Sequence, residues 1–427
     1  MTIRRSATPA SRTLFTMVPI LLLVSLNTFG QVCPLPTPIF SPSAVPAGEP
    51  QPYELNGYQY TPLKPQSFMS LSNIYQIAGV PQLSCIPFQA LASLTGAGTF
   101  LTIDPESSGA DHFMYENGLN AEQESVIVNS WSVSATQPQL PANQQPLLDF
   151  DHDAIRLPNG WTAVIGREEE LMTNSYQCAS FANDYCDVVG AKIVVMDSAG
   201  TVHWVWDSFT QFPYLNRQAI LGDECSPGPQ GCPITLAPVA QDWLHANALS
   251  FDPADGNLIV SLRNQAWIAK LAYQNGTGNG SVVWLMGNGG SFTITANTKG
   301  NEFPWNDYQH DATLWAPGVI GMFDNGNIRN ACCGGQSRGL VYNFDEAALT
   351  ITRIQDYPVR AFSISSGTAQ QLHNGNLWFM GGRFINASGA YSEGFEFVPG
   401  RSTPIWTETL PEQYRSVRVN LGHGGFY

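Results

Sequence analysis

Four segments of the chain repeat one pattern, in which a strand-length stretch, a turn containing glycine and a second strand-length stretch follow one another. Two such stretches joined by turn residues predict a β-hairpin. A second hairpin-like stretch follows each segment, so each repeat predicts a four-stranded sheet, and repeated sheets of this kind are typical of a β-propeller. The segments are HDAIRLPNGWTAVIGRE from His152, HANALSFDPADGNLIVSLRN from His245, HDATLWAPGVIGMFDNG from His310 and GTAQQLHNGNLWFMGGR from Gly367.

The rest of the chain supplies the remaining blades. Residues 56–150 contain less regular strands, such as ESVIVNSWSVSAT, and are expected to form one or two blades. The stretch SVRVNLGHGGFY near the end predicts a strand that closes the ring against an early blade. We therefore predict an all-β chain with one propeller domain over residues 56–427. Four blades are clear from the repeats, and six are expected in total.

The first 55 residues are expected to lie outside the propeller. Three arginines precede an apolar run at residues 14–26, and small residues stand just before position 31, which together predict a signal peptide over residues 1–30. The apolar run is shorter than the roughly 20 residues that span a membrane, so we expect no membrane span in the mature chain. Residues 31–55 form a proline-rich segment. The protein is therefore expected to be exported, to the periplasm or to the outside.

Charge and cysteine content narrow the possible functions. The formal net charge is −15, and such an acidic chain argues against a nucleic-acid partner. An even number of cysteines, eight, in an exported chain predicts disulfides. The pairs Cys178–Cys186 and Cys225–Cys232 would close short loops, whereas the adjacent Cys332 and Cys333 are expected to pair with distant partners. A zinc site is the alternative, although the chain has no CxxC pair.

The repeat also predicts where the histidines meet. The turn of the second repeat centres near Ala254, nine residues after His245 and nine before Arg263, so the two side chains are expected side by side on the hairpin. The first strand of each blade lines the centre of a propeller. His152, His245 and His310 are therefore expected to converge there, and Gly367, at the same place in the fourth repeat, is expected to leave room.

Three histidines beside an arginine predict an anion site with a candidate nucleophile. A neutral imidazole acts as base, nucleophile or metal ligand, and the fork of Arg263 fits a sulfate or phosphate group. Asn247 adds an amide on the same strand face as His245. A three-histidine metal site stays open as an alternative, but the positive charge of Arg263 counts against it. The sequence contains no glycine-rich phosphate loop, Gly-x-Ser-x-Gly motif or HExxH motif.

Several motifs resemble one known family. They are DHDAIRLPNG, DWLHAN, LIVSLRNQAWIAKL, and YQHDATL with MFDNGNIR, within about residues 145–400. In these motifs the chain resembles the PAPS-independent arylsulfate sulfotransferases, which are exported propellers of six blades. The resemblance implies that His310 is the nucleophile, that His152 and His245 are its partners, and that Arg263 and Asn247 bind the transferred group.

The reaction that this resemblance implies is a ping-pong transfer. An aryl sulfate gives its sulfuryl group to His310 and a phenol then accepts it, with no metal and no nucleotide cofactor. A group near Asp324 or Asn325, or the adjacent Asp311, is expected to orient the His310 ring. Two other classes remain open: a metal-dependent propeller hydrolase or lyase with the histidines as ligands, and a non-catalytic propeller of the cell envelope that binds a ligand or partner.

Overall fold

The computed structural model describes residues 53–55, 58–60, 69–72, 90–95, 99–103, 111–119, 125–173, 185–214, 219–221, 223–226, 232–296, 303–372 and 375–419. All of them belong to the second of the two units into which the chain divides, Cys33–Tyr427. The predicted signal peptide and proline-rich segment lie outside these residues, apart from a short strand at Tyr53–Leu55. None of the helices described is long and apolar enough to cross a membrane.

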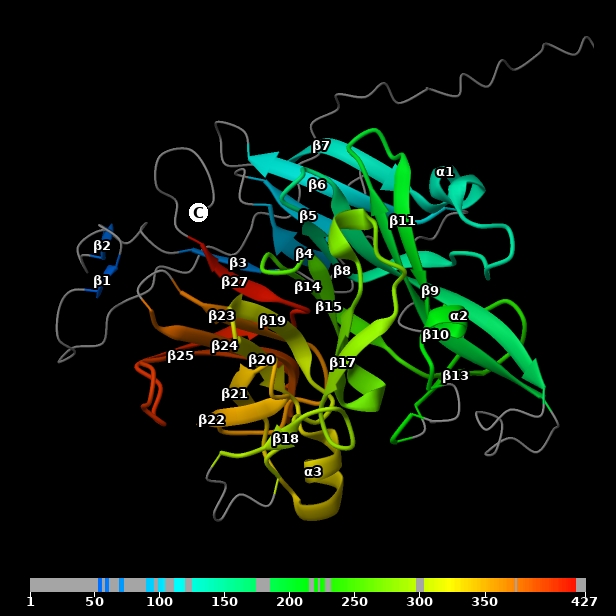
Figure 1. The fold of residues 1–427 in the computed structure, drawn as a ribbon. Coiled ribbons are helices and arrows are strands. Elements are labelled where there is room, and N and C mark those ends of the chain that lie inside the picture. Colours follow the sequence, from blue (N-terminus) through cyan, green and yellow to red (C-terminus); the bar gives the residue numbers. More distant parts are fainter. Residues whose placement is uncertain are drawn as a thin grey trace, which may run out of the picture. The chain divides into compact units, whose positions relative to one another are not determined.

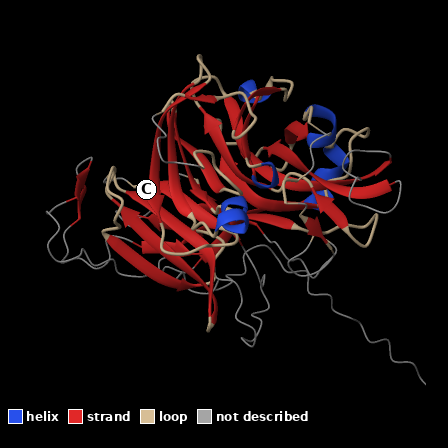
Figure 2. Ribbon diagram, turned by 90° about the horizontal axis from the view of Figure 1, so that it is seen from below, coloured by secondary structure: helices blue, strands red, loops and turns tan. Residues whose placement is uncertain are grey.

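Strands dominate the described residues, and helices are few and short (Figure 2). Five sheets contain four or more strands, and they follow one another along the chain (Figure 1). The first consists of β4 (Ala90–Leu94), β5 (Phe100–Ile103), β6 (Phe113–Leu119) and β7 (Ser125–Ser132). The second has β8 (Asp149–Arg156), β9 (Thr162–Thr173), β10 (Tyr185–Met196) and β11 (Val202–Asp207), and β12 (Glu224–Cys225) and β13 (Ala240–Asp242) extend it beside β10.

The three later sheets correspond to the second, third and fourth sequence repeats. The third sheet has β14 (Ala246–Asp252), β15 (Asn257–Leu262), β16 (Trp267–Leu271) and β17 (Val282–Met286). The fourth has β19 (His310–Ala316), β20 (Val319–Asp324), β21 (Arg338–Asp345) and β22 (Thr350–Pro358), with β18 (Thr293–Ile294) added beside β22. The fifth has β23 (Gly367–Gln371), β24 (Leu377–Asn386), β25 (Gly389–Phe397) and β26 (Trp406–Pro411).

Two further strand pairs and a few helical turns complete the described elements. β27 (Ser416–Val419) pairs antiparallel with the early strand β3 (Met69–Ser72), as the sequence predicted for a closing strand. β1 (Tyr53–Leu55) pairs with β2 (Tyr58–Tyr60). The α-helices are α1 (Val133–Thr136), α2 (Ser208–Gln211) and α3 (Asn327–Cys333), and 3₁₀ turns lie at Gln137–Gln139, Arg263–Gln265 and Gln274–Gly276.

The first strands of successive sheets lie next to one another in chain order. β4 contacts β8, β8 contacts β14, β14 contacts β19, β19 contacts β23, and β23 contacts β27. Antiparallel sheets joined through their first strands are the blades of a β-propeller. The prediction of an all-β propeller is thereby confirmed, while the number of six blades stays a prediction.

The core lies between blades. This explains why the sequence of β15 does not alternate between apolar and polar residues. Leu258 and Val260 face the second sheet, whereas Ile259 faces the fourth. Both faces of the strand are thus covered, and every residue of NLIVSL is buried. A strand buried on both faces reads as a continuous apolar run.

The disulfides agree with the sequence in one case and differ in another. Cys225 and Cys232 are bonded, as predicted. Cys186 is also in a disulfide, but its predicted partner Cys178 lies outside the described residues. Cys332 and Cys333 are bonded to each other, so the prediction of distant partners was wrong. Both lie exposed at the end of the surface helix α3, where their neighbour in the chain is the partner within reach.

Candidate active site

The three histidines of the repeat come together where the first strands of their blades begin. The rings of His152, in β8, and His245, just before β14, meet edge to face with centroids 4.6 Å apart. The ring of Tyr414 lies 5.6 Å from that of His152 and 6.4 Å from that of His310, the first residue of β19. His310 is also within electrostatic range of both other histidines. The structure therefore gathers side chains from three blades into one site.

Local backbone irregularities direct these side chains. The pairing register shifts between Phe150 and Ala154 and again just after His310, so each first strand bulges at its histidine. His152 and His245 have φ angles of 54° and 48°, and Asp311, beside His310, has 51°. Side chains other than glycine rarely adopt this left-handed conformation, and where they do the surroundings must hold them in it. Bulges and such strained residues are common at functional sites.

The nitrogen Nδ1 has a different partner in each histidine. In His152 it pairs with the carboxylate of Asp151, and in His245 with that of Asp242 at 2.5 Å. In His310 it lies 2.7 Å from the amide oxygen of Asn325. Two histidines therefore face a negative charge, and the third faces a neutral group.

The network around Asn325 decides which nitrogen of His310 carries the hydrogen. The side-chain nitrogen of Asn325 donates to the carbonyls of Ser363 and Ser366 at 2.9 and 3.1 Å. Its oxygen therefore faces His310 and accepts a hydrogen bond from Nδ1–H. The backbone N–H of Ser366 lies 3.2 Å from Nε2 and donates to it. His310 is thus a neutral imidazole with the lone pair on Nε2.

Electrostatics agree with this assignment. Burial, and next the positive charge of Arg263, hold the pKa of His310 well below its usual value of 6.5. Burial also lowers the pKa of His245, although the carboxylate of Asp242 opposes the shift. Burial alone would raise the pKa of Asp242, but His245 and the nearby arginines bring it below its usual value. Asp242 is therefore ionised and able to stabilise a protonated His245.

Arg263 lies opposite His245, at the place that the hairpin geometry predicted. Its backbone N–H donates to the carbonyl of His245 at 3.2 Å. Its guanidinium stacks over Tyr308 at 4.6 Å, and Nη1 donates to the side chain of Asn264 at 2.7 Å. Asp223 lies 3.6 Å from the same Nη1. Its Nε–H is buried and has no hydrogen-bond partner in the described part of the chain, so it is available to an anion.

Asn247 is buried in β14 and connects the third and fourth blades. Its side-chain nitrogen donates to the carbonyl of Gln309, the residue before His310, at 2.8 Å. One amide hydrogen is therefore committed to the backbone, and the other remains for a bound group. The oxygen of the same amide has no partner among the described residues.

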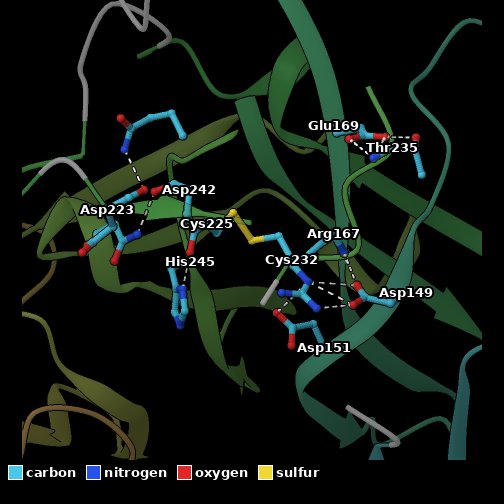
Figure 3. The surroundings of a disulfide bond; sticks show 12 residues. Asp149, Asp151, Arg167, Glu169, Asp223, Cys225, Cys232, Thr235, Asp242 and His245 are labelled. Atoms are coloured by element: carbon cyan, nitrogen blue, oxygen red, sulfur yellow. Dashed lines mark hydrogen bonds and ion pairs between the residues drawn. A yellow bond between two sulfur atoms is a disulfide. The ribbon is translucent and has the colours of Figure 1, made fainter. Parts of the chain in front are cut away.

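Arg167 of β9 supports the site from behind. It binds the carboxylate of Asp149 through two nitrogens and lies 3.4 Å from that of Asp151 (Figure 3). Figure 3 also shows the contact between Asp242 and His245. Asp242 ends β13 of the second sheet, whereas His245 leads into β14 of the third. A small cavity lies between these groups, lined in part by Asp151, Arg167 and His245. Arg167 thus holds in place the carboxylate that orients His152.

Of the three groups that the sequence offered to orient the His310 ring, Asn325 is the one in contact with it. Asp311 does not contact the imidazole, because its carboxylate turns away to accept the backbone N–H of Ala369 at 2.9 Å. The carboxylate of Asp324 is instead bound by Arg329 and Arg338. Gly367 leaves no open space either, since a Cβ there would come within 2.6 Å of the Phe323 ring, which fills the position.

Sequence reasoning missed several residues of the site. Asp151 and Asp242 precede His152 and His245 by one and three residues, so an acidic residue close before a repeat histidine was a usable signal. Tyr414 and the adjacent arginine come from the segment after the last blade, and no motif marks them. Within the described ranges, no group of three or more His, Cys, Asp or Glu side chains is arranged to hold a metal ion.

Comparison with known proteins identifies the family. The model of the arylsulfotransferase (ASST) family matches residues 116–408. Arylsulfate sulfotransferase AssT of Escherichia coli O6:H1 is 24% identical over 256 residues, which cover 49% of this chain and 40% of that protein. The chain thus spans about two fifths of the length of this curated relative.

Solved structures resemble the chain only distantly. A luciferin-regenerating enzyme has a TM-score of 0.37 at 10% identity, over 73% of this chain and 78% of that one. The periplasmic gluconolactonase PpgL of Pseudomonas aeruginosa has the same score and identity, over 78% and 88%. The family model covers well over half of the chain, and this chain therefore belongs to the arylsulfotransferase family.

Proposed function

We propose that this protein transfers a sulfuryl group from an aryl sulfate to a phenol through a covalent intermediate on His310. The family supports the reaction class. The observation that carries the choice of nucleophile is the neutral amide partner of His310, because the other two site histidines are paired with carboxylates. A neutral imidazole with a lone pair on Nε2 is a nucleophile at ordinary pH.

The first half-reaction forms a nitrogen–sulfur bond and breaks the sulfur–oxygen bond of the donor. Nε2 of His310 attacks sulfur, and the aryl oxygen leaves as a phenolate that takes a proton from His152 or His245. Their carboxylate partners, Asp151 and Asp242, stabilise the protonated imidazole that supplies it. In the second half-reaction the same histidine removes the proton of the acceptor phenol, whose oxygen attacks sulfur and releases His310 unchanged.

The sulfuryl oxygens are held by donors that surround His310. Arg263 offers its buried Nε–H, and Asn247 offers its second amide hydrogen. Such groups act mainly by positioning and by stabilising charge in the transition state, as in phosphoryl transfer. The protein groups thus account for the chemistry without a nucleotide cofactor.

The test is to trap the intermediate. Incubation with an aryl sulfate alone, followed by digestion and mass spectrometry at high pH, should find one added sulfuryl group on the peptide that contains His310. His310→Asn should abolish both the label and the release of phenol. His203→Asn is the matched control, because that histidine lies on β11, which pairs with β10 and not with β8, and stacks on Trp161. A label on His152 or His245, or normal turnover in His310→Asn, would show that the roles are wrongly assigned.

Two other functional classes are separated by the same preparation. A metal-dependent hydrolase or lyase would contain stoichiometric metal and lose activity on chelation. A non-catalytic binding propeller would show no transfer in a screen of aryl sulfates with a phenol and no added PAPS. Transfer that persists after chelation supports the sulfotransferase.

We propose in addition that the mature protein is an exported propeller of six blades. The predicted signal peptide over residues 1–30 supports export, and the Cys225–Cys232 disulfide suits an oxidising compartment. Sequencing of the mature N-terminus in the periplasm or medium tests this. A mature chain in the cytoplasm that begins at Met1 would contradict it.

A further inference from the structure

Arg415 is a buried charge that the reaction described above does not use. It lies between β26 and β27, in the segment that leads to the closing strand, and is 2% exposed. Its side chain reaches three other blades. Nη1 lies 2.8 Å from the carboxylate of Asp153, and Nη2 donates to the carbonyl of Asn247 at 2.9 Å and lies 3.6 Å from the carboxylate of Asp311.

Each of these three contacts falls on a residue of the site or on its neighbour in the chain. Asp153 follows His152, and Asp311 follows His310. Both carboxylates also accept a backbone N–H from the next blade, from Leu249 at 2.7 Å and from Ala369 at 2.9 Å. Arg415 therefore connects the two strands that carry the proposed acid–base group and the proposed nucleophile.

The backbone at these points needs such support. His152 and Asp311 both have positive φ angles, which side chains other than glycine avoid. A conformation of this kind persists only when surrounding contacts over-determine it. The contacts of Asp153 and Asp311 with Arg415 hold the chain at these two strained positions.

We propose that Arg415 is a positioning residue, which fixes the separation and orientation of His152 and His310. The proposal rests on the proposed function for its kinetic consequences. The bidentate fork is what the role requires, because one planar group spans Asp153, Asn247 and Asp311 at once. An ammonium group in the same place would reach fewer of them.

The experiment compares Arg415 with Arg418, a second buried arginine of the same segment. Arg418 stacks on Trp406 and Trp378, at 4.0 and 5.2 Å, and its Nη1 lies 3.8 Å from the carboxylate of Glu396. Arg418→Met should lower the melting temperature and leave kcat within about twofold of wild type. Arg415→Met should lower kcat by about 100-fold with little change in KM, as expected when reacting groups are misplaced by about 1 Å. Arg415→Lys should recover part of this loss.

Two further variants keep the test decisive if Arg415→Met does not fold. Arg415→Lys preserves the charge, and Asp311→Asn keeps an oxygen for Ala369 while it removes the attraction to Arg415. Both should slow the labelling of His310 by donor alone. If kcat is normal in Arg415→Lys and Asp311→Asn, measured well below their melting temperatures, Arg415 serves only to close the fold and the proposal is wrong.

A readout that needs no activity separates this proposal from the proposed function. Nitrogen-15 spectra of the histidine rings report their tautomers and surroundings. The Arg415 variants should shift the ring signals of His152 and His310, whereas Arg418→Met should leave them in place. Shifts in a protein that transfers no sulfuryl group would retain the positioning role and reject the sulfotransferase, and unchanged spectra would reject the positioning role.

Discussion

At the scale of the residue, the three repeat histidines are equivalent in sequence and different in chemistry. Each stands at the start of a first strand, yet the group beside Nδ1 is a carboxylate in two cases and an amide in the third. A carboxylate favours the protonated imidazole, whereas an amide leaves the neutral form. The group beside Nδ1 therefore separates the proposed acid–base groups from the proposed nucleophile.

The lowered pKa of His310 predicts a particular pH dependence. Burial, followed by Arg263, shifts this pKa downward, so the ring stays neutral below pH 6.5. Labelling by donor alone should therefore not slow down as the pH is lowered from about 8 to about 6, because His310 stays neutral over this range and acid only favours protonation of the departing phenolate. Rapid-quench measurement of the label at several pH values tests this. A rate that halves near pH 6.5 would indicate an ordinary histidine and contradict the assignment.

Arg263→Lys tests the role of the arginine fork. Lysine keeps the charge but cannot present the buried Nε–H beside a second donor, so kcat/KM should fall by an amount that corresponds to about 1.5–3 kcal/mol. Steady-state kinetics provide the measurement, and the melting temperature provides the control for folding. Wild-type kinetics would mean that Arg263 only packs on Tyr308.

At the scale of the element, a disulfide loop places a carboxylate beside the site. The backbone carbonyl of Asp223 accepts hydrogen bonds from Gln241 and Asp242, and β12 pairs with β13. The Cys225–Cys232 bond joins this strand to the following loop. The side chain of Asp223 thereby lies 3.6 Å from Arg263. A short surface loop thus contributes to the electrostatics of the site.

Removal of this disulfide should cost stability. Replacement of Cys225 and Cys232 by serine should lower the free energy of unfolding by about 2 kcal/mol, the entropy expected for a loop of this size. Urea denaturation measures it. The matched control is the same replacement of Cys332 and Cys333, which closes no loop of intervening residues and should change stability little. Equal effects of the two replacements would argue against the loop-entropy explanation.

At the scale of the whole molecule, the C-terminal segment completes both the fold and the site. β27 pairs with β3, the ring of Tyr414 lies near two histidines, and Arg415 reaches three blades. Some of these contacts join residues more than 250 positions apart, such as Arg415 and Asp153. The segment that closes the sheet array therefore also contributes side chains to the site.

Deletion of residues 412–427 tests this coupling. The shortened chain loses the buried ring of Tyr414, the charge of Arg415 and the closing strand, so its free energy of unfolding should fall by at least about 3 kcal/mol, the cost of one buried aromatic side chain. Labelling of His310 should be lost in parallel. Circular dichroism during urea unfolding gives the stability, and a chain that unfolds at the wild-type midpoint would contradict the coupling.

The sequence by itself determined the features that depend on short-range order. The hairpin repeat predicted antiparallel sheets in series, because strand, turn and strand are encoded within about twenty residues. The symmetric spacing about Ala254 predicted that Arg263 lies against His245, since register in a hairpin follows from its turn. The same register predicted that the repeat histidines share one end of their blades.

Only the tertiary structure decided which partners those side chains meet. Asn325, rather than Asp311 or Asp324, orients His310, because a bulge turns Asp311 away and two arginines hold Asp324. Arg415 reaches Asp153 and Asp311 from the far end of the chain, and no local pattern contains that contact. Hairpin register fixes neighbours within a blade, whereas contacts between blades depend on how the sheets pack around the site. That packing is a property of the whole chain, and for this reason the roles of the residues became distinct only in the folded molecule.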